Sequence, residues 1–297
     1  MQTLLRAVLR VVIVCVACAA FAAQAQDSAK SLLWQVKSKD NTVYLYGTIH
    51  VGKPSFYPLP DAVENAFAHS ARLAVEADIT DQAGIAAIMP LMRYTPPESL
   101  DTQVPKPILQ RLKVQLARYG IPYDSLKQTR PFMVGGLLSI AEFSRLGYDH
   151  RFGVDGYFIE KAVLEGKAVL ELESVDQQVR MLSSLSAAEQ EAFLANTITA
   201  LESGKSAEQV AGMFNAWRSG DPALLEEVVR KASEGMSMTE VLDEKLLYGR
   251  NPAMLSKIEI FLAGNQVHFV AVGALHLIGK RGLVEMLKAK GYKVRQL

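Results

Sequence analysis

Once its first 25 residues are set aside, this 297-residue chain contains no cysteine. The only two, Cys15 and Cys18, both lie in that N-terminal segment, which we expect to be removed. The remaining chain can form no disulfide, use no thiolate nucleophile and offer no cysteine ligand to a metal ion. It must therefore rely on its hydrophobic core for stability.

The N-terminal segment lacks a hydrophobic run long enough to cross a membrane comfortably. Its apolar stretch, residues 11–23, follows Arg6 and Arg10 and is not followed by a stop-transfer cluster of charges. It leads into Ala-Gln-Ala at residues 23–25, an A-x-A cleavage site, so residues 1–25 have the layout of a secretory signal peptide. An uncleaved anchor is the alternative. We predict cleavage near Ala25, a periplasmic or secreted protein, and no stable membrane insertion of the mature chain.

The chain also lacks an excess of charge of one sign. It has 32 Lys and Arg against 31 Asp and Glu, and the signal segment takes away two Arg and no acid. The mature balance is thus 30 against 31, or −1, which is no footprint for nucleic acid or an anionic membrane. Low-complexity tracts and strong linkers are missing too, so we predict a single domain over residues 26–297.

Two hydrophobic strands, one near each end of the chain, carry the same motif, G-x-x-H. The stretches are VYLYGTIHVG at residues 43–52 and FVAVGALHLIG at residues 269–279. A helical pattern and a further strand follow each of them, which is the order of a parallel β-α-β unit. Between them the sequence is mostly helical, as an insertion over about residues 80–265, with a strand at KAVLELE. We predict an α/β fold whose central mixed β-sheet is built from two related strand–G-x-x-H–helix–strand units, with a helical middle region.

The glycine of each motif is expected to end its strand. Gly47 and Gly273 hold these positions, and a glycine there lets the backbone turn sharply or approach a neighbour closely. The side chain three residues later, His50 or His276, then projects over the strand end. Because ligands bind outside the carboxyl ends of parallel strands, we predict that both histidines line one crevice.

Two glutamates fall at the same edge of the predicted sheet. Glu76 lies near the end of the strand RLAVEAD, and Glu173 follows KAVLEL. Two imidazoles with one or two carboxylates suit a divalent ion such as Mn²⁺, Fe²⁺, Co²⁺ or Zn²⁺. Such an ion would lower the pKa of bound water and polarise a carbonyl group. The same residues could also activate water without a metal, through a His–Glu pair.

Each of these residues alone has a structural interpretation. A single histidine after a strand more often bonds a backbone group, and a single glutamate at a strand end is usually solvated. The repetition of G-x-x-H at both ends of the chain favours a functional interpretation. The other three histidines, His69, His150 and His268, lack such a pattern, and we interpret them as structural.

Seven motifs follow one another from about Trp34 to the C-terminus: YLYGTIHVG, VEAD, GVDGYFIEKA, LESVDQQ, AWRSGD, YGRNPAM and VAVGALHLIG. In these motifs and their order the chain resembles the TraB/GumN/PrgY family, which includes the TIKI proteins, and in particular its bacterial GumN-like branch. The paired G-x-x-H motifs are specific in their order, whereas the other motifs alone are not.

The resemblance implies a metal-dependent protease, because TIKI proteins are such enzymes. By match, His50, His276 and Glu76 would form the metal site. Glu173 would be a base or an additional ligand, and Arg250 would bind a substrate carboxylate or stabilise an oxyanion. A structural ion pair is the alternative for Arg250.

Two further residues match family positions. Asp155 falls at the aspartate of the motif GxD, with a helix cap as its structural alternative. Gln178 falls at the family's glutamine and is a weaker candidate.

Three functions remain open from the sequence. The first is a periplasmic metal-dependent hydrolase, a peptidase acting on a peptide or protein. The second is a metal-free esterase-type hydrolase, since the wider superfamily includes erythromycin esterase-like enzymes. The third is a non-enzymatic metal- or haem-binding protein or a scaffold, since another branch of the superfamily binds haem iron.

Overall fold

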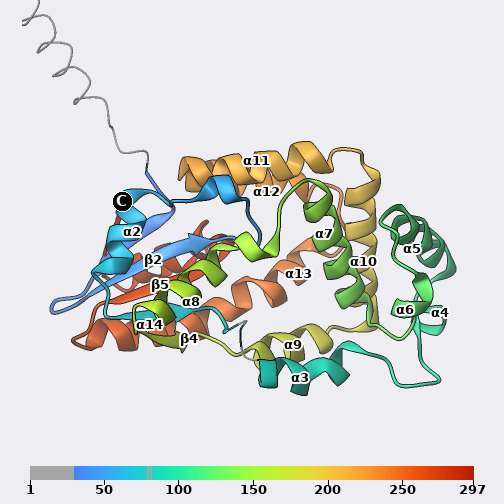
Figure 1. Ribbon diagram of the computed structural model, residues 1–297, viewed down its shortest axis with the longest axis horizontal. Coiled ribbons are helices and arrows are strands. Elements are labelled where there is room, and N and C mark those ends of the chain that lie inside the picture. Colours follow the sequence, from blue (N-terminus) through green and yellow to red (C-terminus); the bar gives the residue numbers. More distant parts are fainter. Residues whose placement is uncertain (1–29, 79, 81) are drawn as a thin grey trace, which may run out of the picture. The chain divides into compact units, whose positions relative to one another are not determined.

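A computed structural model describes residues 30–78, 80 and 82–297 of the chain (Figure 1). The predicted signal peptide and its cleavage site lie outside the described residues. From Ser31 to Leu297 the chain forms one compact unit. Within the described residues, no helix has the length and the apolar character needed to cross a membrane.

Six strands form one mixed sheet in the order β4-β3-β5-β2-β1-β6. Four neighbouring strands, β4, β3, β5 and β2, are parallel, and β1 runs antiparallel to both β2 and β6. The strands are β1 (Leu33–Lys37), β2 (Thr42–Thr48), β3 (Arg72–Val75), β4 (Ala168–Glu171), β5 (His268–Gly273) and β6 (Lys293–Gln296). The prediction of an α/β fold with a mixed sheet and a helical middle region is confirmed.

The order of the strands interleaves the two ends of the chain. The N-terminal β-α-β unit contributes β2 and β3, which are parallel as predicted, but β5 of the C-terminal unit lies between them. This strand is buried along almost its whole length, as expected for a central parallel strand with both faces covered. The two predicted units therefore form one continuous sheet.

Helices cover both faces of the sheet. Successive residues of β5 point to opposite faces. Phe269 packs against Phe158 of α8 (Val154–Leu164) and Phe67 of α2 (Asp61–Ala68), with ring centroids 4.7 and 5.6 Å away. His268 instead stacks on Phe261 of α14 (Asn251–Ala263) at 4.3 Å. Helices α2 and α8 thus lie on one face and α14 lies on the other.

The helical middle region has a second apolar core of its own, formed mainly by α4, α5, α7 and α10. The helical middle region is nevertheless not a separate layer. Its strand β4 belongs to the sheet, and its helix α8 packs on one face of the sheet. The α-helices are α2 (Asp61–Ala68), α3 (Gln82–Ile88), α4 (Leu100–Gln103), α5 (Lys106–Arg118), α6 (Tyr123–Leu126), α7 (Pro131–Arg145), α8 (Val154–Leu164), α9 (Val175–Ser183), α10 (Ala187–Glu202), α11 (Ser206–Ser219), α12 (Pro222–Ala232), α13 (Thr239–Leu246), α14 (Asn251–Ala263), α15 (Ala274–Leu277) and α16 (Leu283–Ala289). Short 3-10 helices are η1 (Pro54–Phe56), η2 (Met89–Met92), η3 (His150–Phe152) and η4 (Tyr248–Arg250).

The two motif glycines occupy different places in their strands. Strand β5 ends at Gly273, as expected, and the single turn α15 begins at the next residue. The expectation for Gly47 is wrong by one residue, because β2 continues through Gly47 to Thr48. A Cβ atom on Gly47 would lie 3.0 Å from the Cα of Ala274. This glycine therefore allows close packing between β2 and α15.

Candidate active site

The register of the parallel strands aligns their carboxyl ends at one edge of the sheet. Thr48 of β2 pairs with Gly273 of β5, and Val75 of β3 pairs with both Ala271 of β5 and Glu171 of β4. The residues that follow these pairs therefore emerge side by side. They include the four residues that the sequence predicts at this edge, which are His50, Glu76, Glu173 and His276.

Arg250 of η4 joins the two glutamates. Its Nε donates hydrogen bonds to both carboxylate oxygens of Glu173, at 3.2 and 3.0 Å, and its Nη2 donates to Oε2 of Glu173 at 2.5 Å and to Oε1 of Glu76. Its Nη1 donates to the carbonyl of Leu246 at 2.8 Å. Gln178 of α9 adds a donor to Oε1 of Glu76 at 2.9 Å. These groups form one nearly buried charged network.

The network bears on the roles expected for its members. The guanidinium of Arg250 already donates to two carboxylates and a carbonyl. This arrangement favours a structural ion pair over a hydrogen bond to substrate. Both oxygens of Glu173 accept from Arg250, which leaves this carboxylate less free to act as a base. Burial alone would raise the pKa of Glu76, but His276, which is charged at the low pH where Glu76 titrates, together with Arg250 and His50 outweighs it and lowers that pKa to about 2. An ionised carboxylate of this kind suits a ligand better than a general base, whose pKa should lie near 7.

His50 is held by a carboxylate. Its Nδ1 lies 2.9 Å from Oδ2 of Asp155, and Oδ1 of Asp155 accepts a hydrogen bond from Oγ1 of Thr48 at 2.5 Å. Asp155 is buried in the first turn of α8 and thus ties that helix to the end of β2. The charge of Asp155 raises the pKa of His50, although water, which reaches 69% of the His50 side chain, screens the attraction.

His276 is held by an amide instead. Its Nδ1 lies 2.7 Å from Oδ1 of Asn251, the first residue of α14, which is fully buried. The His276 side chain is 4% exposed, and its Nε2 faces Oε1 of Glu76 at 3.8 Å. Burial lowers the pKa of His276 to about 4, so the ring is neutral at pH 7.

The three predicted metal-site residues converge on Gly273. A Cβ atom on this glycine would lie 3.2 Å from Oε2 of Glu76, 3.6 Å from Cδ2 of His276 and 3.9 Å from Nε2 of His50. The backbone N–H of Gly273 also donates to Oε2 of Glu76 at 3.2 Å. Gly273 therefore leaves free the space into which the two histidines and Glu76 project.

The donors can be tested for their fit to a divalent metal ion. Each histidine has Nδ1 engaged by an oxygen, which leaves Nε2 as the available ligand atom, the arrangement usual for metal-bound histidine. Glu76, however, is held by Arg250 and Gln178. In residues 30–78, 80 and 82–297, no three His, Cys, Asp or Glu side chains are grouped closely enough to hold an ion. The two imidazoles therefore offer nitrogen donors suited to a divalent ion, but the described side chains as they lie do not form a three-ligand site.

Sequence reasoning missed two residues that support the site. Asn251 was not expected to contact His276, and the only signal was its place directly after Arg250 in the motif YGRNPAM. Trp217, within the motif AWRSGD, donates its indole N–H to the carbonyl of Gly47 at 2.8 Å. Both contacts join segments far apart in the sequence, so local patterns carry little information about them.

The other histidines lie outside this cluster. His69 Nδ1 contacts the carbonyl of Asn65 at 2.7 Å, and His268 Nδ1 contacts the carbonyl of Gln266 at 2.8 Å. His150 lies on η3, 3.4 Å from the carboxylate of Asp149. These contacts are local, in keeping with the structural roles expected for the three.

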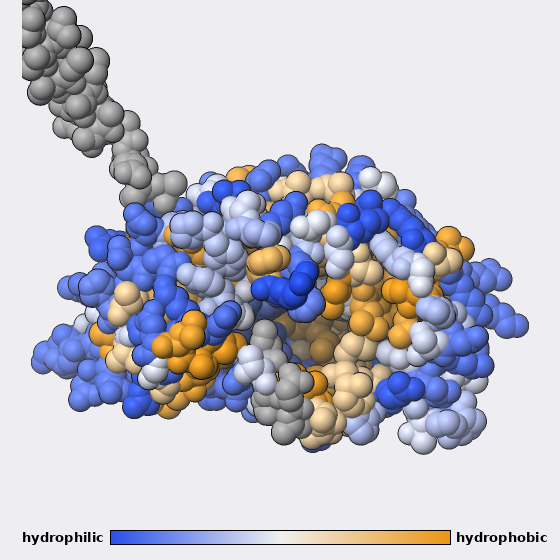
Figure 2. Space-filling view, viewed as in Figure 1, coloured by the Kyte–Doolittle hydropathy of each residue, from blue (hydrophilic) through white to orange (hydrophobic). Residues whose placement is uncertain are grey.

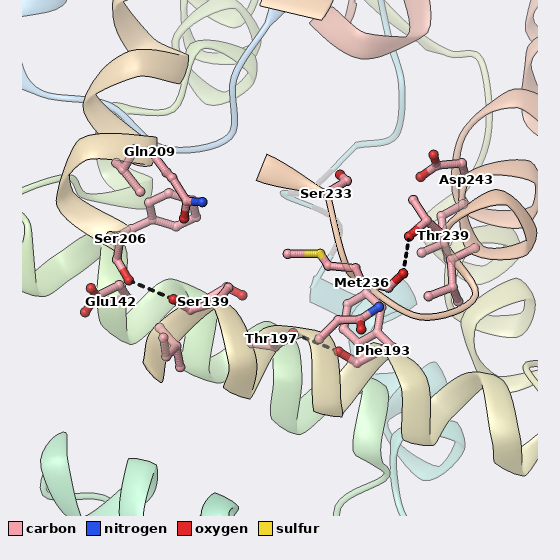
Figure 3. A pocket seen from close by; sticks show the side chains of 17 residues that line it. Ser139, Glu142, Phe193, Thr197, Ser206, Gln209, Ser233, Met236, Thr239 and Asp243 are labelled. Carbon is pink, nitrogen blue, oxygen red and sulfur yellow. Dashed lines mark hydrogen bonds between the residues drawn. The ribbon is translucent and has the colours of Figure 1, made fainter. Parts of the chain in front are cut away.

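A cavity of about 390 Å³ lies elsewhere, between α7, α10, α11 and α13 (Figure 3). Its wall is largely apolar, and hydroxyl groups such as those of Thr197 and Thr239 bond to nearby backbone carbonyls. His50, Glu76 and His276 do not line it. The face of the molecule seen in Figure 2 is mainly hydrophilic and is hollowed near its centre, where hydrophobic side chains gather. We assign no role to the cavity, because none of its contacts points to a ligand.

Comparison with known proteins places the chain among a widespread set of relatives. It is 28% identical over 246 residues to the uncharacterized protein YbaP of Escherichia coli K12, an alignment that covers 82% of this chain and 87% of YbaP. It is 26% identical over 315 residues to a metalloprotease TIKI homolog of Amphimedon queenslandica, and 23% identical over 319 residues to metalloprotease TIKI2 of Danio rerio. These two alignments cover 90% and 91% of this chain, but only 61% of each TIKI protein.

No solved structure matches the chain. The model of the TraB/PrgY/gumN family matches residues 32–296, nearly the whole described unit. That span includes both G-x-x-H motifs, Glu76, Glu173 and Arg250. The chain therefore belongs to the TraB/PrgY/gumN family.

Proposed function

We propose that this protein is a metal-dependent hydrolase, a peptidase that activates water at the edge of the sheet where β2, β3 and β5 end. One observation carries the proposal. His50 and His276 each have Nδ1 fixed by an oxygen acceptor, and both rings project with Glu76 into the space beside Gly273. The distant relatives that are named metalloproteases support the choice of a peptidase.

The metal ligands in this proposal are side chains of the three residues beside Gly273. His50 and His276 would hold a divalent ion through Nε2, with Glu76 as the carboxylate donor. When bound, the ion would lower the pKa of a water molecule and polarise the carbonyl of the substrate. Neither Nε2 is needed to stabilise the fold, because the opposite nitrogen of each ring makes the structural contact.

Other residues position these groups. Arg250 and Gln178 fix the carboxylate of Glu76, and Arg250 also neutralises part of the charge that Glu76 and Glu173 bring together. Asp155 orients His50 through its own contact with Thr48. We assign Glu173 to this support, since its oxygens face Arg250. Its removal should therefore act through Glu76.

One observation favours a second candidate, a metal-free hydrolase. Glu76 is already satisfied by Arg250, Gln178 and the Gly273 N–H, so the carboxylate is positioned without an ion. In that case His50, which is open to solvent, would handle the proton of an attacking water. The two candidates differ in metal content and in sensitivity to chelators.

Elemental analysis and peptide hydrolysis, measured on the same preparations, test the proposal. The wild-type mature chain, purified without added metal, should carry about one Mn, Fe, Co or Zn per chain and cleave members of a peptide library. The double variant His50→Ala/His276→Ala should lose both properties. The matched control His69→Ala/His150→Ala removes the same two side chains from outside the cluster and should keep both.

Each outcome has a definite meaning. Hydrolysis by a protein without metal, unaffected by chelators, would replace the proposal with the metal-free mechanism. Hydrolysis that persists in the His50→Ala/His276→Ala variant would refute both mechanisms. A preparation that holds metal through these histidines but cleaves neither peptides nor esters would indicate a binding protein.

We also propose that the mature protein begins after Ala25 and acts in the periplasm or outside the cell, on the basis of the signal-peptide pattern of residues 1–25. N-terminal sequencing of the exported protein tests this. A mature chain that retains Met1 would contradict it.

A further inference from the structure

We propose that Asn251 and the backbone of the loop after α15 hold a proton on Nδ1 of His276, so that the neutral ring has a single tautomer, with its lone pair on Nε2. Asn251 is then a positioning residue for the candidate active site. The inference deepens the proposed function and rests on it only for the consequence for catalysis. The tautomer itself follows from the contacts of the amide.

The first step is the orientation of the Asn251 amide. Its Nδ2 lies 2.9 Å from the carbonyl oxygen of Arg281, and its Oδ1 lies 2.7 Å from Nδ1 of His276. A carbonyl oxygen can only accept hydrogen bonds, so the amide nitrogen must face Arg281. The reversed amide would set two oxygens against each other at 2.9 Å in a fully buried place. The orientation is thus set by the backbone and not by the histidine.

The second step transfers this orientation to the ring. With Oδ1 facing His276, the contact at 2.7 Å is a hydrogen bond only if Nδ1 carries the proton. A neutral imidazole has one N–H, so Nε2 then bears the lone pair. Nε2 lies 3.8 Å from Oε1 of Glu76, which is beyond hydrogen-bond distance. The contact with Glu76 therefore does not compete for the tautomer.

The backbone around Arg281 holds its carbonyl group in a fixed position. It lies in the tight loop between α15 and α16, where the Gly282 N–H donates to the carbonyl of Gly279 at 3.0 Å. Gly279 has a positive φ of 75°, and a Cβ on Gly282 would lie 2.2 Å from the carbonyl oxygen of Ile278. Only glycine fits this winding of the chain. The loop thereby holds the acceptor that turns the Asn251 amide.

The consequence concerns what His276 can do. An Nε2 lone pair can bind a cation or accept a proton, but it cannot donate a hydrogen bond to the carbonyl oxygen of a substrate. His276 is therefore a ligand or acceptor in the resting enzyme and not part of an oxyanion hole. The electrophilic assistance expected of such a site must come from elsewhere.

Nitrogen-15 and carbon-13 spectra of histidine-labelled full-length mature protein test the tautomer directly, because the two neutral tautomers have distinct ring-nitrogen shifts. The His276 signals are identified by their loss in His276→Gln. At pH 7.5, before and after chelator treatment, we expect the Nδ1–H form to predominate. A predominant Nε2–H form in the chelator-treated wild type overturns the proposal, whatever the protein hydrolyses.

Variants of the amide sharpen the test. Asn251→Leu removes the acceptor and should give a mixture of tautomers. Hydrolysis by Asn251→Leu should fall by about 10- to 100-fold, the usual effect of losing a contact that orients a metal-bound histidine. The matched control Arg281→Ala keeps the backbone carbonyl and should leave the tautomer unchanged.

The outcomes separate this proposal from the proposed function. A pure Nδ1–H signal in folded Asn251→Leu would show that Asn251 does not set the tautomer and would overturn its positioning role. If Asn251→Leu does not fold, the wild-type spectrum still decides. An Nδ1–H signal in a protein that hydrolyses nothing would support the tautomer while refuting the hydrolase.

Discussion

The two G-x-x-H units place their histidines in opposite surroundings. His50 follows β2, is 69% exposed and has a buried carboxylate, Asp155, on its Nδ1. His276 follows β5, is 4% exposed and has a neutral amide, Asn251, on its Nδ1. The same local motif therefore yields one open, readily charged ring and one enclosed, neutral ring. A repeated motif fixes where a side chain projects, whereas its partners decide its chemistry.

The largest effects are expected from removal of each histidine. His50→Ala and His276→Ala should each lower hydrolysis by at least about 100-fold, as expected for groups that serve the reacting water. Stability should separate the two. His276→Ala leaves the buried Asn251 acceptor unpaired and should cost about 1–3 kcal/mol of unfolding free energy. His50→Ala removes an exposed ring, so that water can solvate the Asp155 oxygen that loses its partner, and should cost less, about 1 kcal/mol.

Urea unfolding and hydrolysis rates of the two variants provide the measurement. Equal losses of stability would contradict the assigned difference in burial. Full activity in either variant would remove that histidine from the site.

The two glycines allow a second comparison. A methyl group on Gly47 would meet the backbone of Ala274 at 3.0 Å, so Gly47→Ala should cost about 1–3 kcal/mol through overpacking. A methyl group on Gly273 would enter the space between Glu76 and the two rings. Gly273→Ala should lower hydrolysis by about 10- to 100-fold by displacing those groups, with a smaller loss of stability. Thermal unfolding beside a hydrolysis assay distinguishes the two effects, and a fully active Gly273→Ala protein would show that this space is not used.

A smaller effect is expected where Trp217 binds the backbone of β2. Trp217→Phe removes the N–H that binds the Gly47 carbonyl and should cost about 1 kcal/mol. The neighbourhood of His276 should be unaffected. Thermal unfolding gives the stability, and the histidine spectra show which ring responds. The other tryptophan of the chain, Trp34 on β1, supplies the matched control Trp34→Phe, and a change at His276 in Trp217→Phe would show that the two units are coupled.

The smallest effects concern pH and have opposite signs for the two rings. The folded-state pKa of His50 is raised above 6.5, so its contribution to stability is complete below pH 6.5 and is lost as the pH rises through the folded value. The folded-state pKa of His276 is lowered to about 4, so its contribution is present above pH 6.5 and is lost as the pH falls towards 4. We expect NMR titration of chelator-treated protein to give a higher pKa for His50 than for His276.

The variant Asp155→Asn supplies the control for the titration. It replaces a carboxylate by an amide of the same shape, so the pKa of His50 should fall towards 6.5 while that of His276 stays low. Identical titration of His50 in wild type and variant would exclude Asp155 as the cause.

The strands that carry the candidate site, and the edge at which its residues meet, could be predicted from the sequence, because short local patterns indicate them. The apolar runs before Gly47 and Gly273 predicted β2 and β5, and parallel strands have their carboxyl ends at one edge. That reasoning brought His50, His276 and Glu76 together without any knowledge of tertiary contacts.

The remainder depends on contacts between distant segments. The insertion of β5 between β2 and β3 follows from the packing of the whole sheet, and neither β-α-β unit alone indicates it. The pairing of Asn251 with His276 depends on how α14 packs beside α15. Arg250 had two interpretations of equal standing in the sequence, and its hydrogen bonds to Glu76 and Glu173 depend on where η4 lies in the fold.

The central place of β5 has a consequence for the order of synthesis. Its residues, His268–Gly273, are made long after those of β2 and β3, yet they fill the gap between these two strands. Until a growing chain reaches them, β2 and β3 have no partner on their facing edges, and His276 does not yet exist. Contacts over such separations also close slowly. The candidate site therefore cannot assemble until translation has passed β5 and His276, although β2 and β3 are made much earlier.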